Sequence, residues 1–189
     1  MRFRLIYRGP LPAKVQGFVE EKHAVRRQFH PQLRELWNRH PALLALGGSP
    51  GRIEELADEY TKWGFSFVPL VREENGMGCS LNIVLLRRGE PYRVFDGTGD
   101  LDNRVKNLID ALCIPKQKSQ IEGEKPLIDE DPFFCLMEDD KLVYDFRVET
   151  DRLLVPAQSE EPERDVVAFI EVRVVSWAGN EIAVPAGRF

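Results

Sequence analysis

Residues 99–112, GDLDNRVKNLIDAL, concentrate the side chains that can bind a divalent cation and a phosphate. Asp100 and Asp102 flank one leucine, and residues two apart in an extended chain point the same way, so both carboxylates should face one side. Lys106 and Asp110 follow Asp102 at helical intervals and extend a polar stripe. Carboxylate oxygens are the ligands that Mg²⁺ prefers, and a neighbouring ammonium can meet phosphoryl charge. The spacing predicts a metal-assisted site for phosphate-ester chemistry.

A second acidic pair, Asp139-Asp140, precedes a strand-like segment over about 142–148. The first block should be a helix from about Leu101 to Leu112, because its apolar residues fall on one face. Other interpretations of each block stay open. The aspartate at the helix start is also a good N-cap, the charged stripe resembles an ordinary i,i+4 ladder, and an acidic pair before a strand is often a solvated turn. The two blocks in this order favour a functional site.

Gly-Asp-Leu-Asp-Asn, Lys106 and Asp110-Ala-Leu, followed by Asp-Asp and Val143, resemble the motif of the RusA-type Holliday junction resolvases. The matching blocks cover about a quarter of the chain. The resemblance implies a small dimeric endodeoxyribonuclease, of a kind often carried by phages and prophages, that requires Mg²⁺, with Mn²⁺ as the alternative metal. It implies four catalytic residues: Asp100, Asp102, Lys106 and Asp140. It also implies that Asp100, Asp102 and Asp140 bind the metal, with Asp139 helping.

The resemblance further implies hydrolysis of a phosphodiester in a four-way junction or other branched DNA, leaving a 5′-phosphate and a 3′-hydroxyl. A four-way junction has near two-fold symmetry, so paired cuts call for two active sites in a homodimer. Candidate DNA-binding residues are basic side chains on the N-terminal helices and after the motif helix: Arg26, Arg27, Arg34, Lys116 and Lys118.

The charge of the chain argues for keeping other functions open. The net charge is −5 and the pI about 5.4, and residues 120–165 hold 15 acidic and 5 basic side chains. Much of this acidity lies in an insertion at about 114–138, interpreted as a solvated loop, as a device that narrows access to the site, or as a protein-binding surface. Local phosphate contacts rather than overall pI govern DNA binding. The alternatives are a non-catalytic RusA-like metal-binding module that engages a protein, and a small-nucleotide hydrolase.

Length and composition predict one domain over residues 1–189 in a cytoplasmic protein. No apolar run approaches the length of a membrane span, so no membrane partner is expected. Cys79, Cys113 and Cys135 lack metal-ligand spacing and should be reduced and mostly buried. The histidines, His23, His30 and His40, are expected to be scaffold or surface residues. The tryptophans, Trp37, Trp63 and Trp177, should be core or interface aromatics.

The apolar patterns predict an α+β fold, a mixed β-sheet with helices packed on one side. The expected strands are 3–7, 65–72, 79–86, 142–148 and 166–175, with 92–95 as a possible extension. The expected helices are 15–39, divided by Pro31 into two, and 53–63, besides the motif helix. Residues 41–52 and 157–164 should be loops, and 73–76 a turn that joins two strands.

Overall fold

A computed structural model describes residues 1–11, 19–47, 51–88, 101–154, 156 and 165–176 of the chain. The elements in chain order are β1 (Arg2–Pro10), α1 (Val19–Arg39), α2 (Pro41–Gly47), α3 (Arg52–Glu59), β2 (Thr61–Lys62), β3 (Phe65–Val71), β4 (Met77–Arg87), α4 (Leu101–Leu112), the 3-10 turn η1 (Lys118–Gln120), β5 (Phe133–Met137), the 3-10 turn η2 (Asp140–Leu142), β6 (Val143–Arg152) and β7 (Asp165–Ser176). The predictions for 92–95, 157–164, Asp100 and Trp177 fall outside these residues.

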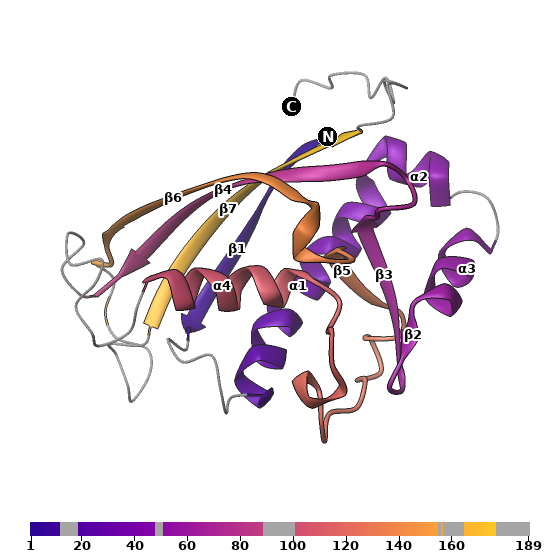
Figure 1. The fold of residues 1–189 in the computed structure, drawn as a ribbon, viewed down its shortest axis with the longest axis horizontal. Helices are drawn as coiled ribbons and strands as arrows, with labels where there is room; N and C mark the ends of the chain where they lie inside the picture. The colour runs from indigo at the N-terminus through magenta and orange to yellow at the C-terminus, as the bar shows by residue number, and fades with distance from the viewer. Residues whose placement is uncertain (12–18, 48–50, 89–100, 155, 157–164, 177–189) are drawn as a thin grey trace.

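The strands form two mixed sheets rather than the single sheet that was expected (Figure 1). One sheet has the order β1-β7-β4-β6, in which only β4 and β6 are parallel. The other has the order β2-β3-β5, in which β3 and β5 are parallel. The α+β class is therefore confirmed, and the prediction of one sheet was wrong.

The four-stranded sheet buries one face against helices α1 and α4, which lie beneath it in Figure 1. Strands β4 and β7 alternate, with Leu81, Ile83 and Ile170 among the side chains that point into the core. Both helices contribute an apolar stripe to the same core. Apolar residues alternate along the strands and recur at helical spacing along the two helices. These two patterns made the elements predictable from the sequence.

Strand β3 is the element that divides the structure into two sheets. Residues 73–76 do form a turn after it, but β3 does not pair with β4 as a hairpin would. Instead, Phe67 of β3 lies opposite Phe133 of β5, and both side chains are fully buried. Buried apolar residues predominate along β3, which suits a strand covered on both faces rather than one half of a hairpin.

Helix α1 continues through Pro31, so the prediction of two helices divided there was wrong. A proline inside a helix removes one backbone hydrogen bond and costs about 3 kcal/mol. Phe29 and Leu33, on either side of Pro31, are both buried, and their packing offsets this cost. Residues 41–47, expected to be a loop, form the short helix α2. The helix expected over 53–63 ends at Glu59, and β2 follows.

The outer edge of β1 is covered by two glutamine side chains of α1. The backbone N–H of Ile6 donates to Oε1 of Gln32 (2.9 Å), and Nε2 of Gln32 donates to the carbonyl of Ile6 (2.7 Å). The N–H of Arg8 donates to Oε1 of Gln28 (3.2 Å). These side chains therefore occupy backbone groups that another strand would otherwise bind.

Among the described residues, no helix combines the length and the apolar character that a membrane span requires.

Candidate functional site

The first two turns of α4 expose two of the predicted site residues. Asp102 and Lys106 are exposed, one helical turn apart, and Asn103 between them is half-buried. One carboxylate oxygen of Asp102 accepts a hydrogen bond from the N–H of Asn103 (2.7 Å). Among the described residues, the ammonium of Lys106 has no hydrogen-bond or ion-pair partner. Both charged groups are therefore accessible to a ligand from solvent.

The opposite face of α4 fixes the direction in which Asp102 and Lys106 point. Val105, Leu108 and Leu112 are buried in the main core, as the apolar stripe predicted. Arg104 is also buried, and its Nη1 donates to the carbonyl of Leu11 (2.6 Å), next to the end of β1. The helix cannot rotate without breaking these contacts, so its exposed face is held in one orientation.

Asp110, the third member of the expected polar stripe, has a structural partner. Its Oδ2 lies 3.3 Å from Nζ of Lys22 on α1, and both side chains are at least four-fifths buried. This ion pair connects α4 to α1 beneath the sheet. Asp102 and Lys106 are therefore open to solvent, whereas Asp110 serves the packing of α4 against α1.

Asp139 and Asp140 lie at η2, where Lys116 contacts both. Its Nζ is 2.6 Å from Oδ1 of Asp140 and 3.3 Å from Oδ1 of Asp139. Asp139 also caps η2 by accepting the N–H of Lys141 (2.9 Å). Partial burial acts to raise the pKa of Asp139, but this hydrogen bond and the contacts with Asp140 and Lys116 lower that pKa on balance. The hydrogen bond to Asp140 raises the pKa of Lys116.

The structure does not bring Asp102 and Asp140 together. Cys113, directly after α4, forms a β-bridge with Met137, so the acidic pair that follows β5 lies at the C-terminal end of α4. Asp102 is in the first turn of that helix, and eleven residues of helical rise correspond to about 16 Å. Asp100 lies outside the described residues. Within those residues, no three His, Cys, Asp or Glu side chains form a group that could hold a metal ion.

A metal at the start of α4 would therefore depend on few protein ligands. Asp102 offers an exposed carboxylate there, and Asp100 precedes it by two residues in the chain. Mg²⁺ commonly binds one or two carboxylates and completes its shell with water and substrate phosphates. The donor chemistry at this position fits Mg²⁺ without requiring Asp139 or Asp140.

Arg26, a candidate DNA contact, is buried, with 1% of its surface exposed. Its guanidinium donates to the carbonyls of Asp110 and Cys113 (both 3.4 Å) and to the carbonyl and side chain of Gln120 (3.4 and 3.3 Å). Carbonyls at a helix C-terminus lack partners within the helix and favour a cation. Arg26 thus caps α4 and has no surface for phosphate in this conformation.

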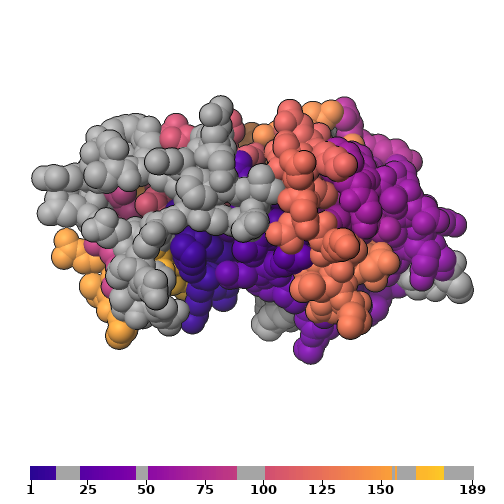
Figure 2. Space-filling view, turned by 90° about the horizontal axis from the view of Figure 1, so that it is seen from below, coloured from indigo at the N-terminus to yellow at the C-terminus, as the bar shows by residue number. Residues whose placement is uncertain are grey.

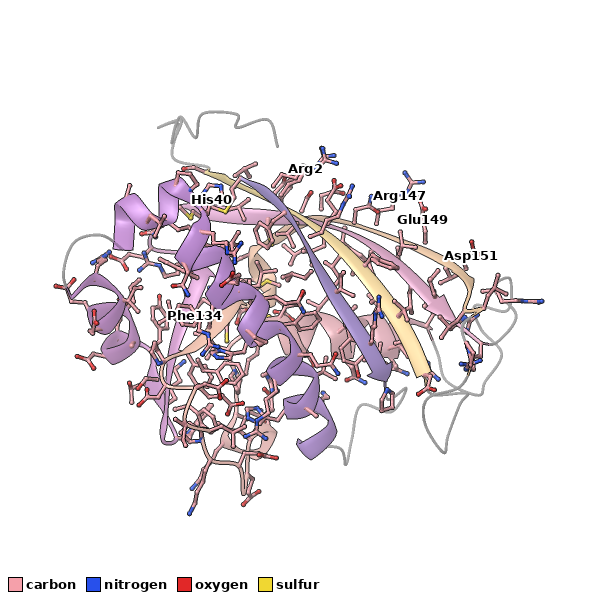
Figure 3. The ribbon with its side chains drawn as sticks, turned by 180° about the vertical axis from the view of Figure 1, so that it is seen from behind. Arg2, His40, Phe134, Arg147, Glu149 and Asp151 are labelled. Atoms are coloured by element: carbon pink, nitrogen blue, oxygen red, sulfur yellow. The ribbon has the colours of Figure 1, made fainter. Side chains whose placement is uncertain are left out.

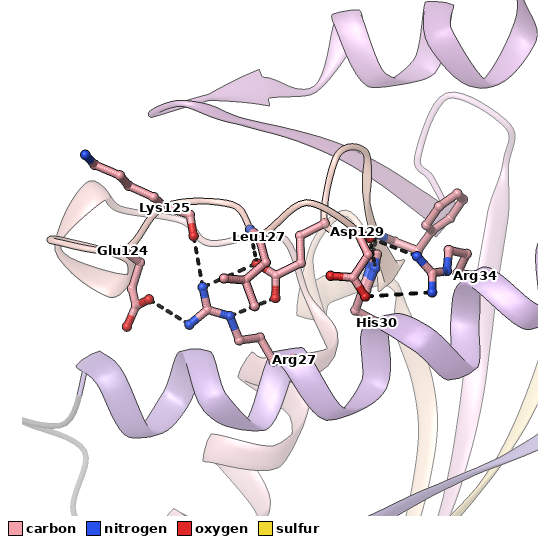
Figure 4. Close-up of polar contacts among 9 residues, drawn as sticks. Arg27, His30, Arg34, Glu124, Lys125, Leu127 and Asp129 are labelled. Carbon is pink, nitrogen blue, oxygen red and sulfur yellow. Dashed lines mark hydrogen bonds and ion pairs between the residues drawn. The ribbon is translucent and has the colours of Figure 1, made fainter.

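Arg27 and Arg34, two further candidates, bind the acidic insertion (Figure 4). Arg27 contacts Glu130 and Glu124, each at 2.7 Å, and donates to the carbonyl of Lys125 at 3.0 Å. Arg34 donates to the carbonyl of Asp129 (3.0 Å). The carboxylate of Glu130 is nearly buried, at 4% exposure, so its pairing with Arg27 is not a solvated surface contact.

His30 completes this contact between α1 and the insertion, a role that the sequence analysis missed. Its Nδ1 accepts the N–H of Phe134 (2.9 Å), which leaves Nε2 to carry the proton and donate to the carbonyl of Asp129 (2.8 Å). Arg27, His30 and Arg34 are spaced three and four residues apart, and so share one helix face. That spacing, together with an acidic segment elsewhere, is the signal that could have identified them.

The insertion is therefore ordered against α1, at the surface of the molecule (Figure 2). Ile121 and Glu130 within it are buried, and the 3-10 turn η1 and strand β5 form from its residues. The interpretation as a solvated loop holds only for its exposed positions, such as Leu127 and Ile128. Lys118, on η1, is the one candidate DNA contact of the five whose side chain is exposed and lacks a partner within the described ranges.

Comparison of the chain with protein families, with curated proteins and with solved structures gives no match in any of the three.

Proposed function

We propose that this protein is a Mg²⁺-dependent endodeoxyribonuclease acting on four-way junctions or other branched DNA. The observation that carries the proposal is the start of α4, where Asp102 and Lys106 are exposed one turn apart on a helix whose opposite face is fixed in the core. The same residues belong to the motif that resembles the RusA-type resolvases. The same proposal makes it a homodimer, since paired cuts require two sites.

Asp100 and Asp102 would hold the metal, with Mn²⁺ as a possible substitute. When bound, the ion would lower the pKa of a water molecule and polarise the scissile phosphate. Lys106 reaches outward from the next turn and would stabilise the negative charge that develops on the phosphoryl oxygens or the leaving oxygen. Asp102 and Lys106 can act together because neither is engaged in an ion pair among the described side chains.

Asp139 and Asp140 take a different place in the proposal from the one implied by the resemblance. Lys116 already balances their charge at the other end of α4. The proposal therefore treats Asp100 and Asp102 as the principal ligands. It predicts that Asp102→Asn weakens Mg²⁺ or Mn²⁺ binding in calorimetry far more than Asp140→Asn does. Equal losses in the two variants would instead support a single shared site.

The decisive test is single-turnover cleavage of a labelled four-way junction by wild type, Lys106→Ala and Lys106→Arg at saturating Mg²⁺. Removing one group that stabilises transition-state charge costs on the order of 10²-fold or more in rate. Lys106→Ala should lose that much activity and retain its metal binding, because one exposed helical lysine contributes little to stability. Lys106→Arg should recover only part of the rate, since a planar guanidinium places its charge differently.

Lys62→Ala is the matched control, because Lys62 is an exposed lysine on β2, away from α4. It should cut as fast as wild type. Linear duplex DNA and free nucleotides serve as substrate controls. Cleavage of nucleotides but not of junctions would identify a small-nucleotide hydrolase. Unchanged cleavage by Lys106→Ala would contradict the proposed role of the lysine.

A non-catalytic module that binds a protein partner is the second candidate, and one observation favours it. Three of the five basic residues considered for DNA contact, Arg27, Arg34 and Lys116, already pair with carboxylates of the same chain. Basic side chains that already pair with carboxylates of the same chain are less available to contact DNA phosphates. Absence of cleavage by wild type on every DNA substrate, with metal binding intact, would make this the preferred function.

A further inference from the structure

Within the described residues, strand β6 forms an open edge of the four-stranded sheet. It pairs with β4 on one side, and among the described residues no strand pairs with its other side. The opposite edge of this sheet, β1, is covered by Gln28 and Gln32. An unpaired edge strand presents a row of backbone donors and acceptors that another strand can bind. The two edges of the sheet therefore differ: side chains of α1 cover β1, whereas no described strand covers β6.

The side chains of β6 are unusual for a solvated edge. Phe146 is 58% exposed, although it lies opposite Leu81 of β4 and therefore on the core side of the sheet. Asp145 and Arg147 flank it on the outer side and are both exposed. Arg147 and Glu149 project away from the sheet along this side of the molecule (Figure 3). The strand thus carries an exposed aromatic ring between charges of opposite sign.

We propose that a second copy of this chain binds the open edge, with the two β6 strands antiparallel about a two-fold axis at Phe146. A two-fold axis is the usual symmetry of a homodimer and requires a self-complementary surface. Residues opposed across the axis must point to the same face, so only registers that pair residues of like parity are allowed. Among these registers, the charges select one.

In the register centred on Phe146, Asp145 of each strand lies opposite Arg147 of the other, which gives two ion pairs on the outer face. On the core side, Phe146 meets its own copy. Opposite charges and aromatic pairs across strands are favourable, and like charges directly opposite are unfavourable. This register contains no like-charge pair over residues 143–149.

The nearest alternatives are centred on Asp145 and on Arg147, and each would place that residue opposite its own copy, which puts like charges together. The next alternative is centred on Val148. It would pair Arg147 with Glu149, but it would also place Asp145 opposite Asp151 twice. Two carboxylates directly opposite each other repel, so this register is disfavoured. The sequence of charges along β6 therefore specifies both the partner, which is the same strand, and its register.

Pairing in this register would join two four-stranded sheets into one continuous sheet of eight strands. The inference specifies the surface for the homodimer of the proposed function, but it does not rest on nuclease activity. A monomer that cuts junctions would refute the inference and the homodimer, but not the nuclease activity. A dimer that cuts nothing would leave the inference standing and refute the proposed function.

The test is a charge swap monitored by light scattering after size exclusion, over a range of micromolar concentrations. Wild type should be a dimer. Arg147→Asp would place an aspartate opposite Asp145, and should raise the dissociation constant on the order of tenfold or more. The Asp145→Arg/Arg147→Asp double variant restores opposite charges and should restore the dimer. Arg8→Asp, the same change on an exposed arginine of β1, should have no effect.

A second experiment reads the register directly and does not depend on affinity. Only the residue on the axis lies opposite itself, at a Cα separation of about 4.5–5.5 Å, which a disulfide can span. Phe146→Cys should therefore cross-link into a covalent dimer on mild oxidation, whereas Val148→Cys should not. The three native cysteines are buried and should not interfere. A monomeric wild type, a swap without rescue, or cross-linking at Val148→Cys instead of Phe146→Cys would overturn the proposal.

Discussion

Arg26 and Arg27 are adjacent in the sequence, yet they contact different parts of the molecule. Arg26 points inward and caps the C-terminal carbonyls of α4. Arg27 points toward the insertion and neutralises the nearly buried carboxylate of Glu130. Successive residues of a helix are rotated by about 100° about its axis, so two neighbouring side chains can contact different parts of the molecule. Both were candidates for DNA contact, because the sequence shows the charge of a side chain but not its partner.

The ion pair between Arg27 and Glu130 should contribute substantially to stability. Arg27→Met keeps most of the side-chain volume but leaves the carboxylate of Glu130 without its cation. Removing one partner of a buried pair costs about 3–5 kcal/mol, and the partial exposure of Arg27 places the expected loss at about 2–4 kcal/mol. The measurement is urea unfolding, with trypsin digestion at Lys125 as a local readout of the insertion.

Arg39→Met provides the control for that experiment. Arg39 is on the same helix and forms an exposed i,i+4 ion pair with Glu35. Exposed pairs of this kind contribute only a few tenths of a kcal/mol. If both variants unfold alike, and Lys125 is cut no faster in Arg27→Met, the insertion is not held by this contact.

His23 is a buried histidine whose charge state should control stability in acid. Its ring is fully buried against Phe65 and Phe133, with centroid distances of 5.3 and 5.7 Å. Burial, helped by the charges of Arg27 and Arg26, lowers the pKa of His23 from 6.5 to about 3. The unfolded chain therefore binds a proton at His23 below about pH 6.5, whereas the folded chain does not.

Stability from His23 is thus complete above about pH 6.5 and is lost as the pH falls toward 3. A difference of one pH unit corresponds to about 1.4 kcal/mol, so the folded state should lose on the order of 2 kcal/mol between about pH 7.5 and pH 5. Burial also lowers the pKa of His30, which adds to the same trend. Urea unfolding of wild type and His23→Phe at both pH values checks this. Identical pH dependence in the two proteins would refute it.

At the scale of elements, local patterns predicted most of the fold. The bounds of α4 were predicted at Leu101 and Leu112, because its start and its apolar stripe are both visible within twelve residues. Strand β5 was not predicted. Its five apolar residues follow an acidic, proline-containing run, and they form a strand only because they pair with β3. The hairpin expected between β3 and β4 failed for the same reason. Pairing partners are distant in the sequence, and propensity alone does not identify them.

The residues of the candidate site also differ in whether local sequence could predict their positions. Exposure of Asp102 and Lys106 follows from the amphipathic pattern of one helix, and it was predictable. The position of Asp140 depends on the path of the insertion between α4 and β5, which a single sequence does not reveal. Contacts such as Arg27 with Glu130 join residues 103 positions apart. Side-chain partners at that range were beyond what residue spacing could indicate.

Pro31 gives a direct test of how packing and propensity compete in α1. Its side chain is exposed, so replacement by alanine removes little packing and restores an N–H that can bond to the carbonyl of Arg27. Alanine is more favourable than proline in a helix interior by about 3 kcal/mol, and we expect Pro31→Ala to stabilise the protein by about 1–3 kcal/mol. Asn38→Ala, at another exposed position of α1, should gain under about 1 kcal/mol. A loss of stability in Pro31→Ala would indicate that the local shape imposed by the proline fits α1 to the sheet.

For the whole molecule, the contrast between the two sheet edges makes a prediction about size. If β6 joins two copies, the ends of the shared sheet are the two β1 edges, each covered by glutamines of α1. The Gln28→Ala/Gln32→Ala variant exposes the backbone of Ile6 and Arg8 at both ends. We expect its mass in light scattering to grow with concentration beyond that of wild type. When Arg147→Asp is added to these two changes, the mass should increase less with concentration, because the β6 edge then pairs poorly.

The glutamines of α1 therefore have a consequence for stoichiometry as well as for local bonding. A sheet with two open edges can add copies without end and become a filament, whereas a sheet with one open edge is complete once two copies have met. If the β6 edges of two copies pair, Gln28 and Gln32 would prevent further copies from adding at the β1 edges. Two side chains on one helix would thus decide whether this protein is a finite particle or a fibre.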